Sequence, residues 1–395
     1  MKVGVVGAGV GGLAAAALLG RIGHDVTLLE RAPVLHPVGA GVLLQRSGQL
    51  VLERLGLLRE IESGAERIER LSATTQYGRP LLRLPLSVDG TALHALGVHR
   101  GDLHGALARL AAEVGVDVLT GVEVVAVEDG TAHASSGAMH GPFDLVIAAD
   151  GSRSRLREQS GLVRFSHAYG HGALWTVGQA PAVRAQLEQT VRGTRELIGL
   201  LPLGSGRCAF FAGVEIAALD RLRAAGFSDW RDRVLSLAPR AEPILAPLER
   251  FDELTVATYR HVVLHRPFTG PLVLIGDAAH SMSPHLGQGV NLALVDAWEL
   301  AAALERSSTV DAALRSYAET RRGHLRYYGL ITMLLSPFFQ SSGTVLGMLR
   351  DLGLPVLWRL PPSRRRMALA AAGLATGISM RQLRLTERLD AGADR

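Results

Sequence analysis

"KVGVVGAGVGGLAAAALLGRIGHDVTLLER", residues 2–31, is the stretch of sequence that decides the fold. Lys2–Val6 is a short apolar run of the kind that a parallel sheet buries on both faces. A glycine-rich turn follows, and the alanine and leucine residues of Leu13–Leu19 predict a helix. Asp25–Glu30 predicts a second strand. This order of strand, turn, helix and strand predicts a doubly wound α/β fold.

The glycines of this turn fit the pattern G-x-G-x-x-G, and each has a physical task. Gly7 permits the tight turn, Gly9 lets the backbone approach a pyrophosphate, and Gly12 lets helix and strand pack closely. The pyrophosphate would sit at the positive N-terminus of the helix. Glu30 ends the second strand, where a carboxylate can accept hydrogen bonds from an adenosine ribose. The sequence therefore predicts a dinucleotide site.

A second stretch, "IGDAAHSMSPHLGQGVNLALVDA" at residues 275–297, indicates which dinucleotide is bound. Asp277 follows an apolar strand and is placed for a ribityl chain. The loop 284–289 opens the helix predicted over Val290–Glu305. Reduction of a flavin puts negative charge near its N1 atom and C2 carbonyl, and a helix N-terminus stabilises such charge. The loop therefore favours FAD over NAD.

The remaining sequence predicts three regions. Residues 1–68, 99–163 and 264–325 form a discontinuous FAD-binding domain, with a helix over 47–64. A β-rich substrate domain over 69–98 and 164–263 is inserted between them and contains a helix near 217–238. Helices fill the C-terminal region, residues 326–395.

Three stretches together carry a family resemblance: residues 7–31, residues 144–157 ("DLVIAADGSRSRLR") and residues 276–297. They resemble the signatures of the class A FAD-dependent monooxygenases, the single-component aromatic hydroxylases with a p-hydroxybenzoate hydroxylase-like fold. The blocks "GAGVLLQRSGQLVLERLGL" and "HRGDL" also fit. The resemblance implies a Rossmann-type FAD domain with an inserted β-rich domain. It also implies NAD(P)H as a transient co-substrate, and O₂ that adds at flavin C4a to give a hydroperoxide. This hydroperoxide would hydroxylate or epoxidise an electron-rich small molecule, with secondary metabolism as an expected context.

The resemblance also implies roles for individual residues. Arg100 would contact FAD near its pyrophosphate and ribityl chain, Asp150 would serve both FAD and the reductant, and Val124 would offer its backbone to the adenine. The cofactor-binding residues that it implies are Gly7, Gly9, Val10, Gly11, Gly12, Glu30, Arg31, Gly41, Val42, Arg46, Arg100, Val124, Asp150, Asp277, Pro284, Gly287, Gly289, Val290 and Asn291.

The substrate pocket is less well defined by the sequence. We expect it to contain His171, Trp175, Phe211 and Pro284. His171 is the one candidate for a catalytic base, with a plain strand residue as the alternative. Thr176 follows Trp175 where the family often has arginine, which weakens any inference of an anionic substrate. Arg46 stands where many relatives have asparagine; it could reach the pyrophosphate or lie on the surface.

Other functions remain open from the sequence: a related halogenase or prenyl reductase, or a non-catalytic flavin-binding partner protein. The halogenase signature W-x-W-x-I-P is absent. No second G-x-G-x-x-G occurs on a strand–turn–helix after residue 151, so the sequence does not predict a separate NAD(P)H domain. His280 and His285 have poor spacing for a metal pair, so no metal is expected.

Composition limits the partners. The pI is near 9.8, yet Lys2 is the only lysine and the arginines are scattered. The run Arg364–Arg366 lacks the interleaved aromatic residues of a nucleic-acid surface, so no nucleic acid is expected. Cys208 is alone and no secretory signal is evident. We therefore expect a cytoplasmic monomer or homodimer that acts on an aromatic or polycyclic small molecule.

Residues 327–349 carry no charge and could by length span a bilayer. Ser336-Pro337 and the polar residues after Phe339 interrupt this stretch. The sequence favours two short buried helices, with a membrane-associated hairpin or a true span as alternatives.

Overall fold

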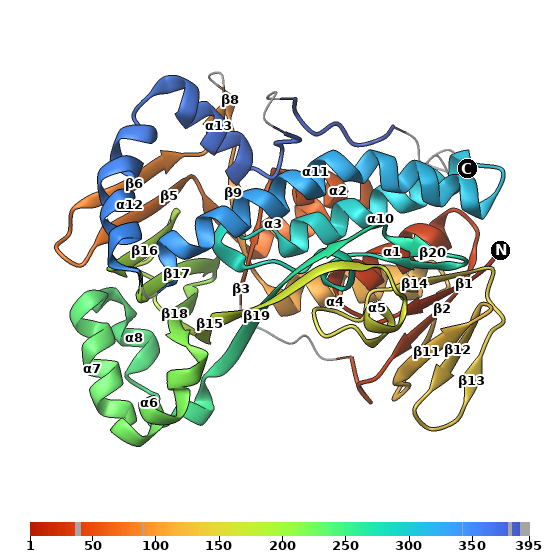
Figure 1. Ribbon diagram of the computed structural model, residues 1–395, viewed down its shortest axis with the longest axis horizontal. Helices are drawn as coiled ribbons and strands as arrows, with labels where there is room; N and C mark the ends of the chain where they lie inside the picture. The colour runs from red at the N-terminus through yellow and green to blue at the C-terminus, as the bar shows by residue number, and fades with distance from the viewer. Residues whose placement is uncertain (36–40, 89–90, 342, 378–380, 388–395) are drawn as a thin grey trace.

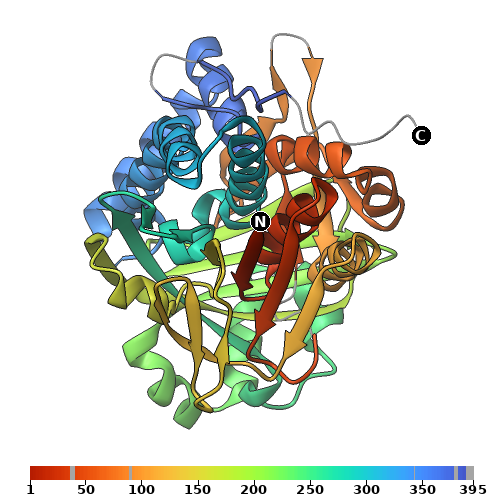
Figure 2. The same cartoon turned by 90° about the vertical axis from the view of Figure 1, so that its right-hand side faces the viewer.

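The computed structural model describes residues 1–35, 41–88, 91–341, 343–377 and 381–387, and it has two large sheets side by side (Figures 1 and 2). The first sheet has six strands in the order β10-β2-β1-β14-β21-β20, and its pairings are parallel except between β20 and β21. Its strands are β1 (Lys2–Val6), β2 (Asp25–Glu30), β10 (Asp117–Thr120), β14 (Leu145–Ala148), β20 (Phe268–Thr269) and β21 (Leu272–Leu274). The predicted α/β fold is confirmed.

Helices bury one face of this sheet. α1 packs against both α4 and α10, and its alanine-rich face lets these helices approach closely. The helices of this layer are α1 (Val10–Arg21), α2 (Arg46–Leu55), α3 (Leu58–Gly64), α4 (Arg100–Glu113) and α10 (Gly289–Arg306). They contribute to the largest apolar core of the described residues. The short helices α5 (Arg155–Gln159) and α9 (Asp277–His280) pack in a separate apolar cluster with residues of β1, β14 and β21.

Three smaller sheets complete the described part of the fold. β11 (Val124–Glu128), β12 (Thr131–Ala134) and β13 (Met139–His140) form one, and β3 (Gly41–Leu44), β9 (Ala95–His99) and β4 (Glu66–Ile68) form another. β7 (Ser87–Val88) pairs with β8 (Thr91–Ala92).

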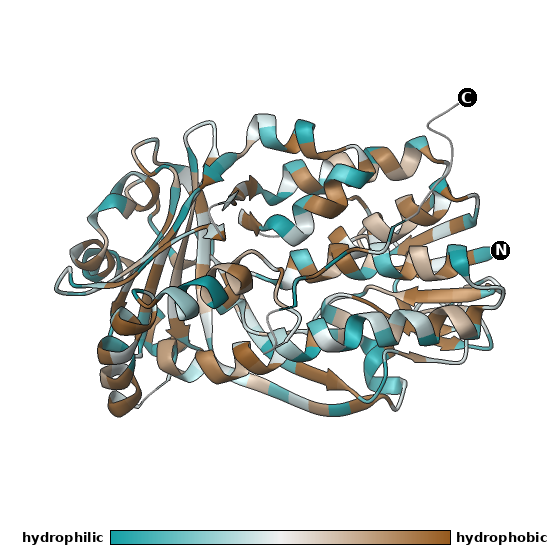
Figure 3. Cartoon of the chain, turned by 90° about the horizontal axis from the view of Figure 1, so that it is seen from above, coloured by the Kyte–Doolittle hydropathy of each residue, from teal (hydrophilic) through white to brown (hydrophobic). Residues whose placement is uncertain are grey.

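The second large sheet has seven strands in the order β19-β15-β18-β17-β16-β5-β6, and apolar residues run along the strands of both large sheets (Figure 3). Its strands are β5 (Arg70–Thr75), β6 (Pro80–Pro85), β15 (Val163–Gln179), β16 (Gln186–Arg192), β17 (Glu196–Gly204), β18 (Arg207–Glu215) and β19 (Thr255–Leu264). The short helices that accompany it are η1 (Ile216–Ala218), α6 (Leu219–Ala225), α7 (Phe227–Leu237), η2 (Pro239–Ala241), α8 (Glu242–Leu245) and η3 (Phe251–Glu253). The division into domains stays a prediction.

Two predicted helices are each broken by a glycine. The helix predicted over 47–64 is α2 and α3, separated at Gly56, whose φ is +78°. The helix predicted near 217–238 is interrupted at Gly226, whose φ is +101°. Glycine adopts this left-handed region without steric cost, and a continuous helix cannot pass through it.

The prediction of two short buried helices over 327–349 is wrong. Residues up to Phe339 belong to the long helix α11 (Val310–Phe339), which is followed by α12 (Thr344–Leu357) and α13 (Pro361–Ala371). Pro337 lacks the N–H group that would bond to the carbonyl oxygen of Met333, and α11 ends two residues later. Many apolar side chains of α11 and α12 are exposed rather than buried. No single helix in the described residues is long and apolar enough to cross a membrane; α11 and α12 meet the length and composition criteria only as a pair, bent by 111°.

Candidate active site

A cavity of about 860 Å³ lies where the carboxyl ends of the parallel strands face the seven-stranded sheet. Gly9, Ala149 and Asp277 line it from turns that follow β1, β14 and β21, and Trp175 and Phe211 line it from β15 and β18. Ligands of open α/β sheets bind outside the carboxyl ends of the strands. The volume is in the range of small-molecule and cofactor sites.

The glycine-rich turn after β1 has two kinds of glycine. A Cβ on Gly7 would lie 2.5 Å from the carbonyl oxygen of Ala149, and one on Gly12 would lie 1.9 Å from that of Gly7. These two positions are closed by the protein itself. A Cβ on Gly9 would meet nothing within 4 Å, and Gly9 lines the cavity. The open side of Gly9, at the N-terminus of α1, is thus left for a ligand, and it suits an anion.

Glu30 is held at the edge of this turn. Its Oε2 accepts a hydrogen bond from the backbone N–H of Ala8 at 2.7 Å, and its Oε1 accepts one from Ala32 at 2.9 Å. A carboxylate has about four acceptor sites, so sites remain for ribose hydroxyls. Arg31 is exposed and Val124 is buried at the start of β11, and neither lines the cavity.

Arg100 and Asp277 supply opposite charges to the cavity wall. Burial lowers the pKa of Arg100, while the nearby Asp277 acts to raise it. An arginine removed from water in this way favours an anionic ligand. Arg46 is outside the cavity lining; its Nη2 lies 3.4 Å from Oε2 of Glu53, which fits the surface alternative.

Asp150 has a buried carboxylate oxygen that lacks a hydrogen-bond partner. Burial is the main cause that raises the pKa of its carboxyl group, and its Oδ1 is buried without a hydrogen-bond partner. The adjacent residues Ala149 and Gly151 line the cavity. A buried acceptor without a partner is costly, so a bound hydroxyl or N–H group would relieve this cost.

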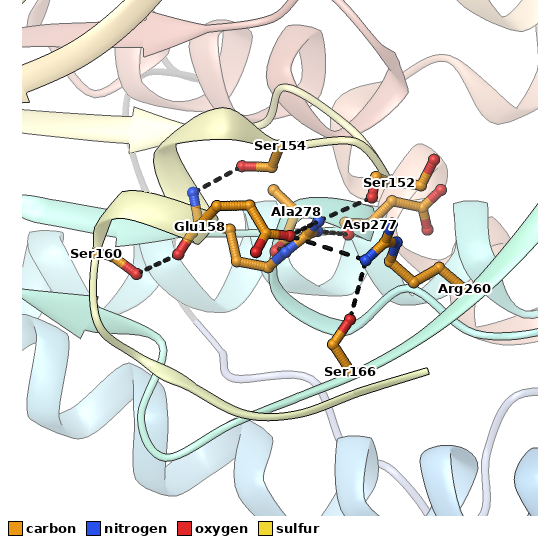
Figure 4. Close-up of polar contacts among 9 residues, drawn as sticks. Ser152, Ser154, Glu158, Ser160, Ser166, Arg260, Asp277 and Ala278 are labelled. Atoms are coloured by element: carbon orange, nitrogen blue, oxygen red, sulfur yellow. Dashed lines mark hydrogen bonds and ion pairs between the residues drawn. The ribbon is translucent and has the colours of Figure 1, made fainter. Parts of the chain in front are cut away.

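Nothing in the sequence singled out Arg157, which joins two turns of the site. Figure 4 labels its partners on these turns, Ser152, Asp277 and Ala278. Its guanidinium group, only 1% exposed, donates to the carbonyl oxygens of Ser152 at 2.9 Å, Ala278 at 3.3 Å and Asp277 at 3.4 Å. The turns after β14 and β21 are thereby fixed to each other. Three arginines occur in "SRSRLR", and only burial distinguishes this one from Arg153 and Arg155.

The N-terminus of α10 faces the cavity, since Gly289 and Val290 line it. The first N–H groups of a helix have no intrahelical acceptor, so they can bind a ligand. A Cβ on Gly289 would make only an ordinary contact with Oδ1 of Asp277 at 3.6 Å. Gly287, whose φ is +62°, also lines the cavity, as do Gly41 and Val42 across from it.

Asn291 has a different task from its neighbours. Its Oδ1 accepts from the backbone N–H of Gln45 at 2.8 Å, and its Nδ2 donates to the carbonyl oxygens of Leu43 and Gly287, both at 3.0 Å. The side chain is therefore fully committed to the protein. It joins β3 to the loop before α10 and does not line the cavity.

A buried charge cluster fixes the turn that carries Asp277. Asp296 accepts hydrogen bonds from the backbone N–H of Gly276 at 2.8 Å and from Nε of Arg321 at 2.7 Å, and it pairs with His280. Burial alone would raise the pKa of Asp296, but His280 and Arg321 hold it below its usual range. His280 thus has a structural contact. No pattern in the sequence pointed to Arg321, which lies 25 residues after Asp296, on α11.

The substrate end of the cavity is aromatic and apolar. The rings of Trp175 and Phe211 stack with centroids 5.0 Å apart and planes inclined by 30°, and Pro284 also lines the cavity. His171 does not line it; His285 does. Burial lowers the pKa of His285 to about 4, so its ring is neutral near pH 7. Its Nε2 is buried without a hydrogen-bond partner.

No group of three or more histidine, cysteine or acidic side chains among the residues described could hold a metal ion. The observations instead fit an organic anion such as FAD: an open glycine at the N-terminus of α1, a desolvated Arg100 and the unmet acceptor of Asp150. The N-terminus of α10 adds free donors at the same cavity.

Comparison with known proteins identifies a family and its members. Residues 1–327 match the family model described as an FAD binding domain. A probable 2-heptyl-3-hydroxy-4(1H)-quinolone synthase, AqdB2 of Rhodococcus erythropolis, is 29% identical over 97% of this chain and 95% of its own length. A 3-amino-4-hydroxybenzoate 2-monooxygenase of Streptomyces cremeus is 30% identical over 81% of this chain and 83% of its own length.

Solved structures agree on the fold. The structure of Klebsiella pneumoniae HpxO complexed with FAD and uric acid matches with a TM-score of 0.79 and 25% identity. The match covers 94% of this chain and 97% of that one.

Proposed function

Because this chain belongs to the FAD binding domain family and is an FAD-dependent monooxygenase that uses NAD(P)H and O₂, we propose that it hydroxylates a fused heteroaromatic ring carrying an aliphatic tail. The observation that carries this proposal is the long apolar cavity. Besides Arg100 and Asp277, which would face FAD, Arg366 is the one residue of the described lining with a full charge at pH 7.

The residues of the parallel sheet would hold FAD. We place the pyrophosphate at the open side of Gly9, the ribityl chain between Arg100 and Asp277, and the flavin ring at the N-terminus of α10. When bound, FAD supplies the redox chemistry, in which electrons from NAD(P)H activate O₂ so that one oxygen atom reaches an electron-rich carbon. The buried contacts of Arg157 and Asp296 would keep the turn at Asp277 in position.

The ring of the substrate would lie beside Trp175 and Phe211, whose stacked side chains form a flat wall. Beyond this wall the cavity is aliphatic, with leucines from the seven-stranded sheet and from the C-terminal helices. These include Leu82, Leu187, Leu197, Leu335, Leu354 and Leu357. An alkyl tail of several carbons fits such a lining, and AqdB2 is named for a heptyl quinolone.

We assign His285 as the group that accepts a hydrogen bond from the ring N–H or O–H of the substrate. Ser336 Oγ donates to the carbonyl oxygen of Thr332 at 2.7 Å, so Ser283 Oγ, 2.6 Å away, donates to Ser336. His285 Nδ1 lies 2.9 Å from Ser283 Oγ and must then be the donor. The hydrogen is on Nδ1, and Nε2 is left as a bare acceptor. His171 stays an untested alternative.

The relatives favour hydroxylation over the halogenase, prenyl reductase and non-catalytic alternatives, because two relatives named as monooxygenases, for 3-amino-4-hydroxybenzoate and 6-hydroxynicotinate, each match 81% of the chain. We further infer that the protein works in the cytoplasm, where NAD(P)H is available. We also propose that the protein is a monomer or a homodimer, which a measurement of its mass in solution distinguishes.

The proposal is tested by NAD(P)H oxidation and product analysis with 4(1H)-quinolones that carry tails of increasing length at C2. We expect turnover with a seven-carbon tail and an apparent affinity that rises about threefold to fourfold per methylene group. Equal activity toward ring compounds without a tail would contradict the proposal that the substrate carries an aliphatic tail. No hydroxylated product with any ring compound would contradict the substrate class. His285→Phe should weaken substrate binding to the oxidised enzyme about tenfold or more, measured from the flavin absorbance.

A further inference from the structure

Exposed apolar side chains gather on the C-terminal helices. Of the sixteen large apolar side chains that are exposed in the described residues, ten lie between 330 and 360. Monomeric soluble proteins seldom expose large contiguous apolar patches, and such patches mark interaction sites. We call these ten side chains the apolar patch: Leu330, Met333, Leu334, Val345, Met348, Leu349, Leu352, Val356, Leu357 and Leu360.

The patch follows the helical period. On α12, Val345, Met348, Leu349, Leu352 and Val356 recur at spacings of three and four residues, so they share one face. This face does not pack against the protein, since these side chains are 55% to 74% exposed. The opposite face packs on β6 and α11 and includes the buried Gly347 and Arg350. Figure 1 shows α12 at the left end of the molecule, overlapping β5 and β6 in this view.

The excess of positive charge lies in the same region. Residues 326–386 contain eight arginines and one acidic residue, whereas the formal net charge of the whole chain is only +5. The rest of the chain is therefore slightly acidic. Arg326, Arg359, Arg364 and Arg366 are exposed beside the apolar patch. The one acid, Asp351, is already paired with Arg350 at 2.6 Å.

We propose that the apolar patch docks on an anionic lipid bilayer, with α12 lying in the interface and the arginines at the headgroups. An apolar helix face bordered by arginines is the pattern of interfacial helices, and the cytoplasmic leaflet carries anionic lipids. Trp358 at the end of α12 is a residue type enriched at membrane interfaces. A second copy of the chain suits the patch less well, because a two-fold contact would bring like-charged arginines together.

The patch also reaches the lining of the cavity. Leu357 belongs to the patch and lines the cavity. Leu354, three residues earlier on α12, lines the cavity without belonging to the patch. Met367 and Arg366 line the cavity from α13. A substrate with an aliphatic tail partitions into lipid, and this path would take it from the bilayer to the flavin without crossing water. This consequence rests on the proposed function; the docking itself does not.

The test is co-sedimentation of the full-length holoenzyme with vesicles of phosphatidylglycerol and phosphatidylcholine, and with vesicles of phosphatidylcholine alone. We expect binding to the anionic vesicles to be at least tenfold tighter and to weaken when the salt is raised to about 0.5 M. Leu349→Glu/Leu352→Glu should lower binding to anionic vesicles tenfold or more, and Arg326→Gln/Arg364→Gln should lower it severalfold.

A matched control is Met139→Glu, which changes a residue that is 69% exposed on β13, away from the patch. Its vesicle binding should equal that of the wild type. FAD content and turnover of a short-tailed, soluble substrate should stay unchanged in Leu349→Glu/Leu352→Glu, which separates this inference from the proposed function.

Two kinds of result would overturn the inference. One is a vesicle assay in which sedimentation is equal with and without anionic vesicles, or in which the patch variant binds as tightly as the wild type. The other is light scattering that shows a wild-type dimer which Leu349→Glu/Leu352→Glu converts to monomers, because the patch would then be covered by a second copy.

Discussion

The helices α1 and α12 have similar length and similarly apolar sequences, yet they lie in opposite surroundings. Nine of the twelve residues of α1 are buried, whereas only Gly347 and Arg350 are buried among the fourteen of α12. Both reach the same cavity. α1 contributes backbone at Gly9 and Gly11, and α12 contributes the side chains of Leu354 and Leu357. Apolar composition therefore predicts that a helix has a partner, and it does not tell whether this partner belongs to the chain.

The largest expected difference between a substitution in α1 and one in α12 is at Gly12. A Cβ there would lie 1.9 Å from the carbonyl oxygen of Gly7, which is backbone and cannot give way cheaply. Gly12→Val should destabilise the protein by more than about 4 kcal/mol and abolish FAD binding. Urea denaturation and the FAD content of the purified protein measure both. A stable, yellow Gly12→Val variant would show that α1 can move away from its strand.

A smaller loss is expected from a side chain in the middle of α1. Leu18 is 1% exposed within the largest core cluster. Leu18→Ala should lower the free energy of unfolding by about 2–5 kcal/mol, since it leaves a cavity that neighbours only partly fill. Urea denaturation of the apoprotein measures this, with the exposed Leu352→Ala as the matched variant. A change below about 1 kcal/mol would mean that α1 is less tightly packed than its burial indicates.

The backbone contribution of α1 to the cavity can be tested at Gly9. A Cβ there meets nothing in the protein within 4 Å, so the apoprotein of Gly9→Ala should keep its stability within about 1 kcal/mol. The methyl group would occupy the space assigned to the pyrophosphate, and FAD affinity should fall about tenfold or more. Titration with FAD, followed by fluorescence, measures this. Unchanged affinity would place the pyrophosphate elsewhere.

The side-chain contribution of α12 can be tested at Leu354. Leu354→Ala shortens one wall of the aliphatic end of the cavity. The KM for a substrate with a seven-carbon tail should rise about threefold to tenfold, while that for a tail-less ring stays the same. Steady-state kinetics with both substrates provide the measurement. Equal changes in the KM of both substrates would indicate that Leu354 contacts the ring of the substrate rather than its tail.

The smallest effect is expected on the exposed face of α12. Leu352 is 74% exposed, so Leu352→Ala should change the free energy of unfolding by less than about 0.5 kcal/mol. Urea denaturation beside Leu18→Ala gives the comparison directly. A loss above about 1.5 kcal/mol would mean that a second copy already covers this face in solution.

The same contrast explains what the sequence could predict. A backbone that approaches a ligand requires glycine, and Gly7, Gly9 and Gly12 therefore form a recognisable pattern in the right place. Trp175, Phe211 and Pro284 were also expected in the pocket, and they line the cavity. The roles of individual residues toward FAD stay predictions.

The residues that the sequence missed are distinguished only by burial. Arg157 resembles its neighbours Arg153 and Arg155 in the sequence, and Asp296 meets Arg321 only because α10 packs on α11. His171 does not line the cavity whereas His285 does, and no local pattern in the sequence tells which histidine lies at the cavity wall. The arginines looked scattered for a related reason: their excess near α12 is visible only when the scarcity of acids there is counted.

The hydrogen bonds of Asn291 set an order on the assembly of the molecule. Its Oδ1 accepts from Gln45, which is 246 residues earlier in the chain. Contacts between such distant residues form late, because a long loop must close before they can stabilise anything. During synthesis from the N-terminus, the strands and glycine turn near residue 7 emerge long before α10. If the N-terminus of α10 holds the flavin as proposed, the nascent chain can bind it only after about three quarters of the residues have been made.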